Sequence, residues 1–592
     1  MDSVTLTVDG KQVTAPKGTT VLQAAIQAGI QVPYYCYHPG LGIDGSCRVC
    51  IVKIEKMPKL QTSCSTPCAD GMVVTTNSED VEAARASVFE FLLINHPLDC
   101  PVCDKGGECP LQDFSYTFGP ERSRMEFPRR EFDGGNGVKA DVDFGPTLML
   151  NRNRCILCTR CVRFMREVDG DAQISIVNRS YGSQIATFKE EGVHSLLSGN
   201  LMDVCPVGAI TTRDYRFKSR PWDNPMAIDT ICTQCERGCN TTLWIKAKPE
   251  WAKGAQVVRA TPRYNPDVND FWMCDIGRFE LDWIESEQRL RRPLVRRGGA
   301  AVPTNWDDAL NTVKARVAET GGAASVRYLA SAHASLEELH LLAGLAGGPR
   351  NVALSWRYQP KSQPADTTFV VPPVDAPNLR GARDLGFAVP AESAPADLSG
   401  IRGDLTAGRI QALYVFDPGP DGSIGDVSWI LEARRAGRLP VLIYQGVLLT
   451  ALASEADVVI PGACFAEKDA TYTNFKGRVQ ATAQAITPPG EAQEDWRILT
   501  RIASILGASI PFASAAAIRE SLAASVTAIP GYEALRSIKF ARPVSQRTWL
   551  QTSNPSERWK WDFMFQDLPP IKFGVEFGPL PRADVIPLRE VK

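Results

Sequence analysis

The beginning of the chain alternates apolar and polar residues with the period of a β-strand. Apolar side chains occupy positions 4, 6 and 8, and Asp9-Gly10 leads into a second alternating run over residues 12–15. This pattern predicts a hairpin with a two-residue turn. A short helix is expected next, capped by Thr19 or Thr20 and ended by Gly29. Together these elements predict a small β-grasp domain.

Beyond Ala300 the apolar pattern changes to helices that alternate with short β-rich runs. Residues 306–319 carry apolar side chains at helical spacing, which predicts an amphipathic helix. Buried strands are expected at 326–329, 369–371, 412–416, 441–444 and 458–460. Such alternation predicts a parallel α/β sheet. The segment has neither a G-x-G-x-x-G motif nor a Walker loop, so nothing in it indicates NADH or ATP binding.

From about Pro511 the chain loses its periodicity. Proline, arginine and aromatic residues dominate this end, among them Trp559, Trp561, Phe563 and Phe565. Residues 511–592 are therefore expected to form an extended tail, laid over a partner protein or over the chain's own α/β domain.

The composition is that of a large globular protein. A chain of 592 residues corresponds to about four domains at ~150 residues each. Charged residues make up 22% and the formal net charge is -2, so neither a nucleic-acid footprint nor an acidic disordered tail is indicated. The expected partners are therefore other proteins.

The cysteines indicate metal ligation in a reducing compartment. Seventeen cysteines occur mostly in C-x2-C spacings, which are typical of reduced thiolates on metal rather than of a disulfide scaffold. No apolar stretch reaches the ~18 residues that a spanning helix needs, and the chain does not open with a basic segment followed by an apolar run. We expect no direct membrane span, although the chain can dock on a membrane partner.

A loop early in the chain predicts a first metal site. Cys36, Cys47 and Cys50 have the spacing C-x10-C-x2-C, and either Cys64 or Cys68 can supply a fourth thiolate. Four thiolates suit one 2Fe-2S cluster. Glycines in the same loop allow backbone N–H groups to approach the sulfurs and stabilise the added electron.

A second site is predicted in a segment broken by prolines and glycines, which can be neither a regular helix nor a central strand. His96, Cys100, Cys103 and Cys109 give H-x3-C-x2-C-x5-C. The spacing suits a structural zinc site or an iron-sulfur cluster. The rest of the chain favours the cluster, because sixteen plausible ligands recur as four groups of four.

Two further sets predict 4Fe-4S clusters. One is a C-x2-C-x2-C triplet that opens like a bacterial ferredoxin motif and is completed by a distant Cys-Pro, and the other reads C-x2-C-x3-C-x34-C. Their ligands are Cys155, Cys158, Cys161 and Cys205 in the first set and Cys232, Cys235, Cys239 and Cys274 in the second. Zinc remains the alternative, although zinc sites usually draw on two separated pairs. A remaining lone thiol such as Cys464 is expected to be small buried filler.

Longer motifs surround these cysteines. They are Cys36-Tyr37-His38-Pro39, Cys47-Arg48-Val49-Cys50, the run from Glu90 to Cys100, the run from Cys155 to Phe164, and Leu197-Ser198-Gly199-Asn200 before Cys205-Pro206-Val207-Gly208-Ala209. With these motifs the first 280 residues resemble the large iron-sulfur subunit of bacterial NADH-quinone oxidoreductase, respiratory complex I. The remainder, with residues 465–468 and 473–480, is similar to the molybdopterin-oxidoreductase fold that this subunit carries, but shorter than usual.

The resemblance implies an α+β and α/β multidomain fold and selects Cys64 over Cys68 as the fourth 2Fe-2S ligand. The implied domains are a plant-type 2Fe-2S ferredoxin-like domain (1–80), a 4Fe-4S domain with one histidine and three cysteine ligands (81–145), a 4Fe-4S ferredoxin-like domain (146–222), a molybdopterin-oxidoreductase-type 4Fe-4S domain (223–285), a molybdopterin-oxidoreductase-like α/β domain (286–510) and the tail (511–592). No molybdopterin is expected, because Ile276 stands where molybdenum relatives place a lysine between cluster and pterin.

The resemblance also implies the function. Electrons from NADH would enter through a flavoprotein subunit and its small 2Fe-2S partner, pass along one 2Fe-2S and three 4Fe-4S clusters here, and leave through downstream iron-sulfur and quinone-site subunits. The chain would contribute to a proton-translocating complex at the cytoplasmic face of the cell membrane, without a catalytic acid or base and without NADH activity of its own. The neutral imidazole of His96 would raise the potential of its cluster.

An electron-transfer subunit of a formate dehydrogenase or hydrogenase is the alternative function. A hydrogenase would need further cysteine motifs after residue 280, where only Cys464 occurs. A formate dehydrogenase would normally add a second set beside Cys155, and none is present.

Overall fold

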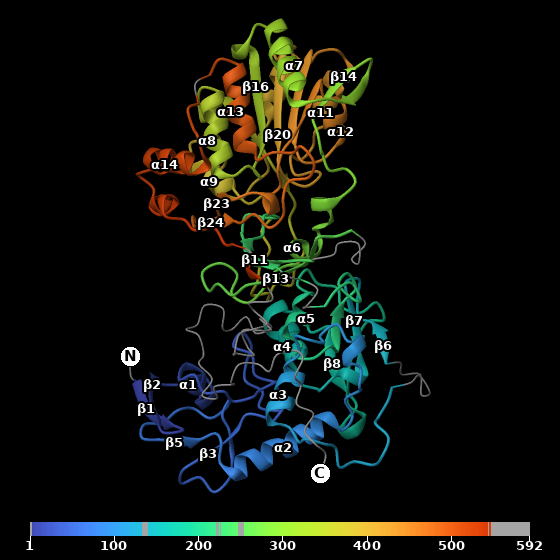
Figure 1. Cartoon of the computed structure of the whole chain (residues 1–592), viewed down its shortest axis with the longest axis vertical. Coiled ribbons are helices and arrows are strands. Elements are labelled where there is room, and N and C mark those ends of the chain that lie inside the picture. Colours follow the sequence, from blue (N-terminus) through green and yellow to red (C-terminus); the bar gives the residue numbers. More distant parts are fainter. Residues whose placement is uncertain are drawn as a thin grey trace.

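The computed structural model describes residues 3–132, 140–220, 224, 226–246, 254–508, 510–542 and 544–545. The molecule is elongated, with the cysteine-rich first part of the chain at one end and the α/β domain at the other (Figure 1). A small sheet and helix α6 (Asp275–Phe279) lie between these two parts. No helix among the described residues is both long and apolar enough to cross a membrane.

The first domain has the predicted β-grasp form. Its mixed sheet has the order β2-β1-β5-β3-β4. The elements are β1 (Ser3–Val8), β2 (Lys11–Pro16), α1 (Val21–Gln27), β3 (Ile51–Ile54), β4 (Gln61–Thr62) and β5 (Val73–Thr75). Asp9 and Gly10 both have positive φ, 47° and 78°, as a type I′ hairpin turn requires. Thr20 caps α1 in a reciprocal capping box with Gln23, so the predicted hairpin and helix start are confirmed.

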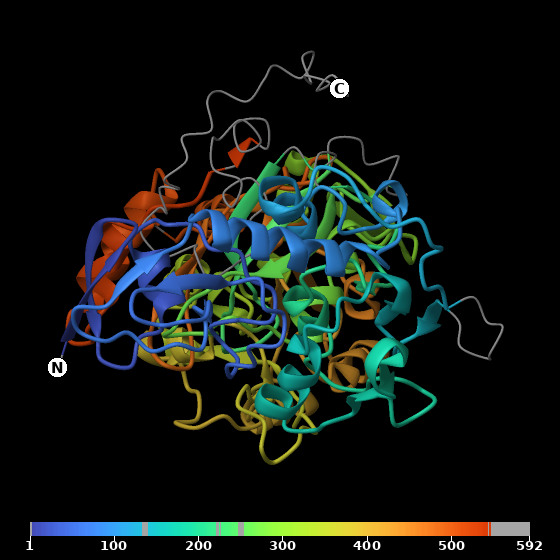
Figure 2. The ribbon, with the colours of Figure 1, turned by 90° about the horizontal axis from the view of Figure 1, so that it is seen from below.

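The next region is built from short elements around the cysteines. They are α2 (Glu79–Leu93), α3 (Pro110–Phe118), β6 (Asp141–Asp143), β7 (Leu148–Asn151), α4 (Arg160–Phe164), β8 (Ile174–Val177), β9 (Gln184–Thr187), α5 (Asn200–Val204) and β10 (Ile210–Thr212), with short η turns at Cys100–Val102, Arg152–Arg154, Met165–Asp169 and Ser180–Gly182. Strands β10, β7 and β6 form one sheet, and β8 and β9 form a hairpin. Figure 2 shows the long helix α2 (blue) crossing this end of the molecule. One continuous apolar core joins this region to the β-grasp and contains most of the clustered cysteines.

The middle sheet joins distant parts of the chain. Its strands are β11 (Met226–Ile231), β12 (Asn240–Ile245), β13 (Val257–Pro262) and β25 (Val544–Ser545), in the order β13-β12-β11-β25. All neighbouring strands are antiparallel, and β25 pairs with the start of β11. Residues from near the end of the described chain therefore complete a sheet that is otherwise formed just after the ferredoxin-like region.

The α/β domain has three layers around a seven-stranded sheet. The order is β15-β14-β22-β21-β20-β16-β17, with the last five parallel and β14 and β15 antiparallel. The strands are β14 (Leu294–Arg297), β15 (Ala300–Pro303), β16 (Val326–Ser331), β17 (Val352–Ser355), β20 (Ala412–Asp417), β21 (Val441–Gly446) and β22 (Val458–Pro461), and small pairs are β18 (Arg357–Tyr358) with β19 (Val374–Asp375) and β23 (Ala470–Thr473) with β24 (Val479–Thr482).

Helices cover both faces of this sheet. One face packs against α7 (Trp306–Glu319), α8 (Leu336–Leu345), α9 (Leu379–Asp384), α13 (Asp495–Ile505) and α14 (Ala515–Ser525). The other packs against α10 (Ser399–Thr406), α11 (Ser428–Arg435) and α12 (Ala451–Ser454). The helix at 306–319 and four of the five expected strands are confirmed.

The strand predicted at 369–371 is wrong. These residues lie in a loop, although Phe369 and Val371 are buried. They pack into the apolar core of the cysteine-rich region rather than into the sheet. The guanidinium of Arg237 lies 4.3 Å from the Phe369 ring centroid. An apolar triplet can thus be buried by an interdomain contact, which periodicity does not distinguish from a strand.

Residues 511–536 do not form the extended tail predicted for them. Ser514 caps α14, whose Ile518 and Leu522 are buried in the core of the α/β domain. A short η helix follows at Tyr532–Arg536. Residues 546–592, with the aromatic residues expected in an extended tail, lie outside the described residues. The helix was missed because its alanine-rich sequence has only a weak apolar stripe.

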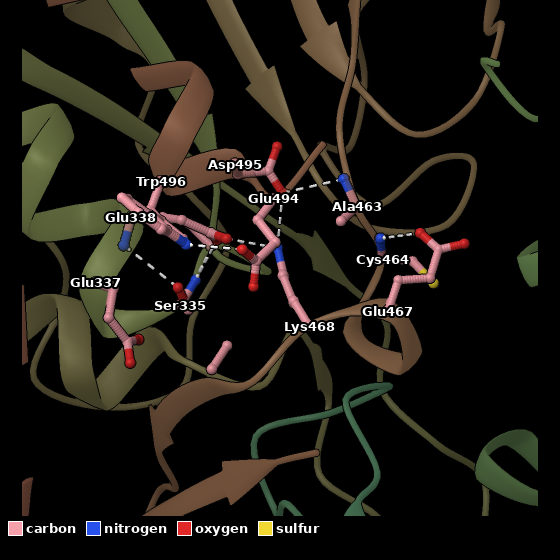
Figure 3. Close-up of polar contacts among 12 residues, drawn as sticks. Ser335, Glu337, Glu338, Ala463, Cys464, Glu467, Lys468, Glu494, Asp495 and Trp496 are labelled. Atoms are coloured by element: carbon pink, nitrogen blue, oxygen red, sulfur yellow. Dashed lines mark hydrogen bonds and ion pairs between the residues drawn. The ribbon is translucent and has the colours of Figure 1, made fainter. Parts of the chain in front are cut away.

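A buried group of charges joins α8, α13 and the segment after β22 (Figure 3). The ammonium of Lys468 lies 2.8 Å from Asp495 and also pairs with Glu338. All three side chains are at most 4% exposed. Asp495 also accepts hydrogen bonds from Gln445 and from the Ala463 backbone. The ammonium of Lys468 is therefore the counter-charge of two buried carboxyl groups.

Replacing Lys468 by Met should lower the free energy of unfolding by about 3–5 kcal/mol, because two buried carboxyl groups lose their counter-charge. Urea unfolding at pH 7 measures the change. Lys314→Met on exposed α7 is the control and should stay within about 0.5 kcal/mol of the wild-type protein. Equal stability of the two variants would contradict a role of Lys468 in holding the network.

Candidate iron-sulfur sites

The fold gathers the first cysteine set between α1 and β3. The thiol of Cys36 is in hydrogen-bond contact with Cys47 and Cys64, and Cys64 is also in contact with Cys50. These contacts lower the pKa of Cys36 far below its usual value and lower that of Cys50 to about 7. Cys68 is shifted by burial alone, which raises its pKa. The structure thus brings Cys64, and not Cys68, to the other three thiols.

Backbone hydrogen bonds fix this arrangement. The N–H of Ser63 donates to the carbonyl of Cys50 at 3.0 Å, and its hydroxyl donates to the same oxygen at 2.7 Å. The carbonyl of Ser63 accepts from Leu22 in α1. Gly45, in the left-handed conformation with φ 72°, supplies a backbone hydrogen bond to the Cys36 sulfur. The capped helix therefore holds Cys64 against the loop that carries the other three cysteines.

The second set lines a cavity of about 300 Å³ between the end of α2 and the start of α3. His96, Cys100, Cys103 and Cys109 all contribute to its wall. Gly208 forms part of the wall as well, and a Cβ atom there would lie 2.0 Å from the Cys103 sulfur. The cavity therefore depends on the absence of a side chain at this position. Sequence reasoning did not single out Gly208, although it lies in the motif after Cys205-Pro206.

The imidazole of His96 is neutral and incompletely hydrogen-bonded in this loop. Burial lowers its pKa to about 4, and the nearby Arg154 contributes. The imidazole is therefore neutral at pH 7. Its Nδ1 atom is buried and has no hydrogen-bond partner among the described residues. Arg129 holds the loop by donating to the carbonyl oxygens of Leu93 and His96 at 2.6 and 2.7 Å.

The backbone of the third set contains two non-glycine residues in the left-handed conformation. Leu157 and Thr159, which lie between the cysteines of the triplet, both have positive φ, 54° and 63°. This winding turns the three thiols toward Cys205, which follows α5. Burial first, and then the other thiols, raise the pKa of Cys155 to about 12 and that of Cys158 to about 11. These thiols are therefore protonated at pH 7, and ligation of a metal cluster would require them to release their protons.

The fourth set connects the middle sheet to α6. The N–H of Cys232 donates to the Cys239 carbonyl at 2.8 Å, and Cys274 stands at the N-cap of α6. Cys235 lies near Cys232 and Cys274, which, after burial, raise its pKa well above the usual value. A Cβ atom on Gly277 would lie 2.7 Å from the Cys232 sulfur. The fourth thiol of the set is therefore brought close by the first turn of α6.

The sets are close neighbours in the fold. The Cys109 sulfur lies 4.0 Å from the carbonyl of Pro206, beside Cys205. Asn200 in α5 donates to the carbonyl of Met273, beside Cys274, at 2.8 Å. The guanidinium of Arg163, in α4, donates to the Cys36 carbonyl. The third set thus contacts the surroundings of each of the other three.

The residues present fit iron-sulfur clusters. Fifteen thiols and one neutral imidazole form four sets, most of their members are buried, and glycines leave room beside the sulfurs. In the described part of the chain no three His, Cys, Asp or Glu side chains close around a point that a single ion would fill. Cys464 is buried outside these sets, next to the ion pair of Arg289 with Glu467, as expected for a filler residue.

Family models match four parts of the chain. They are the 2Fe-2S iron-sulfur cluster binding domain over residues 1–79, the NADH-ubiquinone oxidoreductase-G iron-sulfur binding region over 85–124, the ferredoxin-like domain of NADH-quinone oxidoreductase subunit 3 over 145–211, and molybdopterin oxidoreductase over 399–505. Their order confirms the predicted multidomain fold class and supports binding of both 2Fe-2S and 4Fe-4S clusters.

Relatives match almost the whole chain. The mitochondrial NADH-ubiquinone oxidoreductase 78 kDa subunit of Neurospora crassa is 31% identical over 95% of this chain and 90% of its own length. The corresponding Candida albicans subunit is 32% identical over 86% and 83%. The G-subunit of the NADH-quinone oxidoreductase of Rickettsia bellii is 29% identical over 91% and 92%. The chain belongs to this family, the large iron-sulfur subunits of NADH-quinone oxidoreductase, respiratory complex I.

Proposed function

We propose that the chain holds one 2Fe-2S and three 4Fe-4S clusters and relays electrons within complex I from the NADH-oxidising subunit toward quinone. The observation that carries this proposal is the convergence of all four ligand sets in one fold region. The clusters would accept and donate single electrons. The chain's own residues ligate them, exclude water and keep neighbouring sets close, and no acid or base is required.

The ligand sets of the clusters follow the four groups of side chains. We assign Cys36, Cys47, Cys50 and Cys64 to the 2Fe-2S cluster, and the sets that begin at His96, Cys155 and Cys232 to the 4Fe-4S clusters. Domain boundaries at residues 80, 145, 222 and 285 are proposed with this assignment, so that each of the first four domains holds one ligand set. The boundary expected at residue 510 is not kept, because Ile518 and Leu522 of α14 lie in the core of the α/β domain.

The His96 loop is proposed as the place where electrons leave the chain. Cys100 is exposed, whereas most other assigned ligands are buried. The apolar residues two positions before and after it are also exposed: Leu98 is 83% exposed and Val102 54%. Exposed apolar side chains around a cluster are expected where another protein docks. A downstream iron-sulfur subunit would cover this surface, while the flavoprotein and its small 2Fe-2S subunit would contact the chain elsewhere.

The α/β domain is proposed to be a scaffold without molybdopterin, although its family includes molybdopterin oxidoreductases. Ligands of such folds usually bind where the strand order reverses, here between the ends of β16 and β20. His333, Asp417 and Ser423 fill this position, and Ser423 donates to Asp417. Gly419 packs so closely that a Cβ atom would lie 2.7 Å from the His333 ring. Ile276 also cannot link the fourth cluster to a pterin.

The proposed location is the peripheral arm of the complex at the cytoplasmic face of the membrane. Family membership supports assembly with other complex I subunits. Proton translocation would be a property of the whole complex, and the isolated chain would not oxidise NADH.

Changing His96 to Cys should keep the second cluster but lower its midpoint potential by roughly 100 mV, because a thiolate adds a negative charge where the imidazole is neutral. Anaerobic EPR titration of the full chain measures the potential. A cluster that titrates as in the wild-type protein would exclude His96 as a ligand.

Replacing Cys64 by Ser should remove the 2Fe-2S signal or shift it strongly, whereas Cys68→Ser should leave it unchanged. Both substitutions alter a buried thiol of the same segment, so Cys68→Ser is the matched control. Visible absorption and EPR spectra of the two variants distinguish them. The opposite result would assign Cys68 as the ligand.

Replacing Cys232 by Ala should lower the yield of the assembled subunit more than the electron-transfer rate of the complexes that do assemble, because the fourth cluster would serve stability. Cys464→Ala, which removes a buried thiol outside the sets, should leave the iron content unchanged. Metal analysis should find no stoichiometric molybdenum or tungsten in the wild-type chain. An assembled Cys232→Ala complex without electron transfer would contradict the scaffold role.

A further inference from the structure

The buried arginines of the described residues fall into two groups. Three are paired with carboxylates: Arg154 with Asp99, Arg278 with Asp203 and Arg289 with Glu467. The other three, Arg85, Arg160 and Arg163, are 2–4% exposed and have no carboxylate within 4 Å among the described residues.

The three unpaired arginines all bind carbonyl groups beside proposed cluster ligands. Arg163 donates to the carbonyls of Cys36 and Gly42. Arg160 donates to Tyr37 and, at 3.3 Å, to Val204, which precedes Cys205.

Arg85 repeats this pattern on the opposite side of the first ligand set. It donates at 2.9 Å to Ile51, which follows Cys50, and at 3.2 Å to Thr76. Burial lowers the pKa of Arg85 to about 10, while a Cys50 thiolate acts in the opposite direction. All three unpaired arginines therefore bind backbone at or next to the first set, and Arg160 also binds backbone next to Cys205 of the third set.

Nearby acidic groups do not replace the missing partners. Glu82 and Asp9 act on Arg85 only at longer range, and Asp9 accepts from Thr76 instead. Glu167, near Arg163, binds the N–H of Gly42 and pairs with Arg166. Carbonyl oxygens satisfy several N–H groups of the arginines, but they do not neutralise the charge. A buried cation normally has a counter-charge.

A cluster with four thiolate ligands supplies that counter-charge. Its net charge is negative and becomes more negative by one electron on reduction. A fixed cation nearby stabilises the reduced form more than the oxidised form, so it raises the reduction potential. The effect is strong where water is excluded, because the local dielectric is low.

We infer that Arg85, Arg160 and Arg163 set the reduction potentials of the clusters held by the Cys36 and Cys155 sets, with the clusters as their counter-ions. This inference rests on the proposed function. Arg85 acts on the 2Fe-2S cluster alone, whereas Arg160 and Arg163 act on both clusters. Each cluster would take its electron from the redox centre that precedes it in the relay, which for the first cluster lies in the NADH-oxidising subunit, and no proton is transferred in the step.

The test uses the full chain with its clusters, purified anaerobically, and the variants Arg85→Gln, Arg160→Gln and Arg163→Gln. EPR titration should give midpoint potentials lower by at least about 59 mV, a tenfold change in electron distribution. Arg85→Gln should shift only the 2Fe-2S signal, and the other two should shift both signals. Arg163→Lys, which retains the positive charge, should have midpoint potentials close to those of the wild-type chain.

Arg166→Gln is the matched control. It removes the same charge from the same segment, but its side chain is 63% exposed and paired with Glu167, so its potentials should equal those of the wild-type chain. The inference is overturned if the three Gln variants carry clusters of wild-type EPR intensity and have the same midpoint potentials as Arg166→Gln. Three separate positions keep the test decisive if one variant does not fold. A wild-type chain without reducible cluster signals would instead refute the proposed function.

Discussion

The structure depends on the cost of burying sulfur ligands together. The ligand sets place thiols so close that burial and mutual repulsion raise the pKa of most of them, as at Cys155 and Cys232. Without a metal such thiols stay protonated and fill their places as ordinary apolar side chains. With a cluster they would become thiolates whose charge the iron offsets in part. Cluster insertion would therefore release protons from cysteines that already belong to the same apolar core as the strands and helices around them.

Local patterns predicted the parts of the fold that local forces determine. The Asp9-Gly10 turn, the capping of α1 by Thr20 and the four confirmed strands of the α/β sheet all follow from periodicity and turn chemistry. The segment 369–371 was misread because its apolar side chains pack across a domain boundary. The ligand sets could be read from spacing, but spacing left Cys64 and Cys68 open, because Cys64 is positioned by hydrogen bonds of Ser63 to residues distant in sequence. No spacing in the sequence distinguishes the unpaired arginines. They are recognised only by their burial and by the lack of a nearby carboxylate in the described structure.

The α/β domain has the parallel strand order of a cofactor-binding fold, and buried side chains fill the place where the strand order reverses. Side chains occupy the position between β16 and β20 that usually admits a ligand, and Lys468 with its two carboxyl partners stabilises the adjoining edge. At this position Ser423 donates a hydrogen bond to Asp417, whereas Nε2 of His333 has no hydrogen-bond partner among the described residues. On the proposed scaffold role, the domain would not need a bound pterin, and its surface would be available for assembly with other proteins.

The pairing of β25 with β11 has a consequence for biosynthesis. On the ribosome, the ferredoxin-like region and β11 emerge long before β25, so the outer edge of β11 remains unpaired while the whole α/β domain is being made. A product interrupted before Val544 would expose that edge permanently. An unpaired strand edge is a template for pairing with another chain, so chains interrupted before β25 should aggregate more readily than chains that contain it.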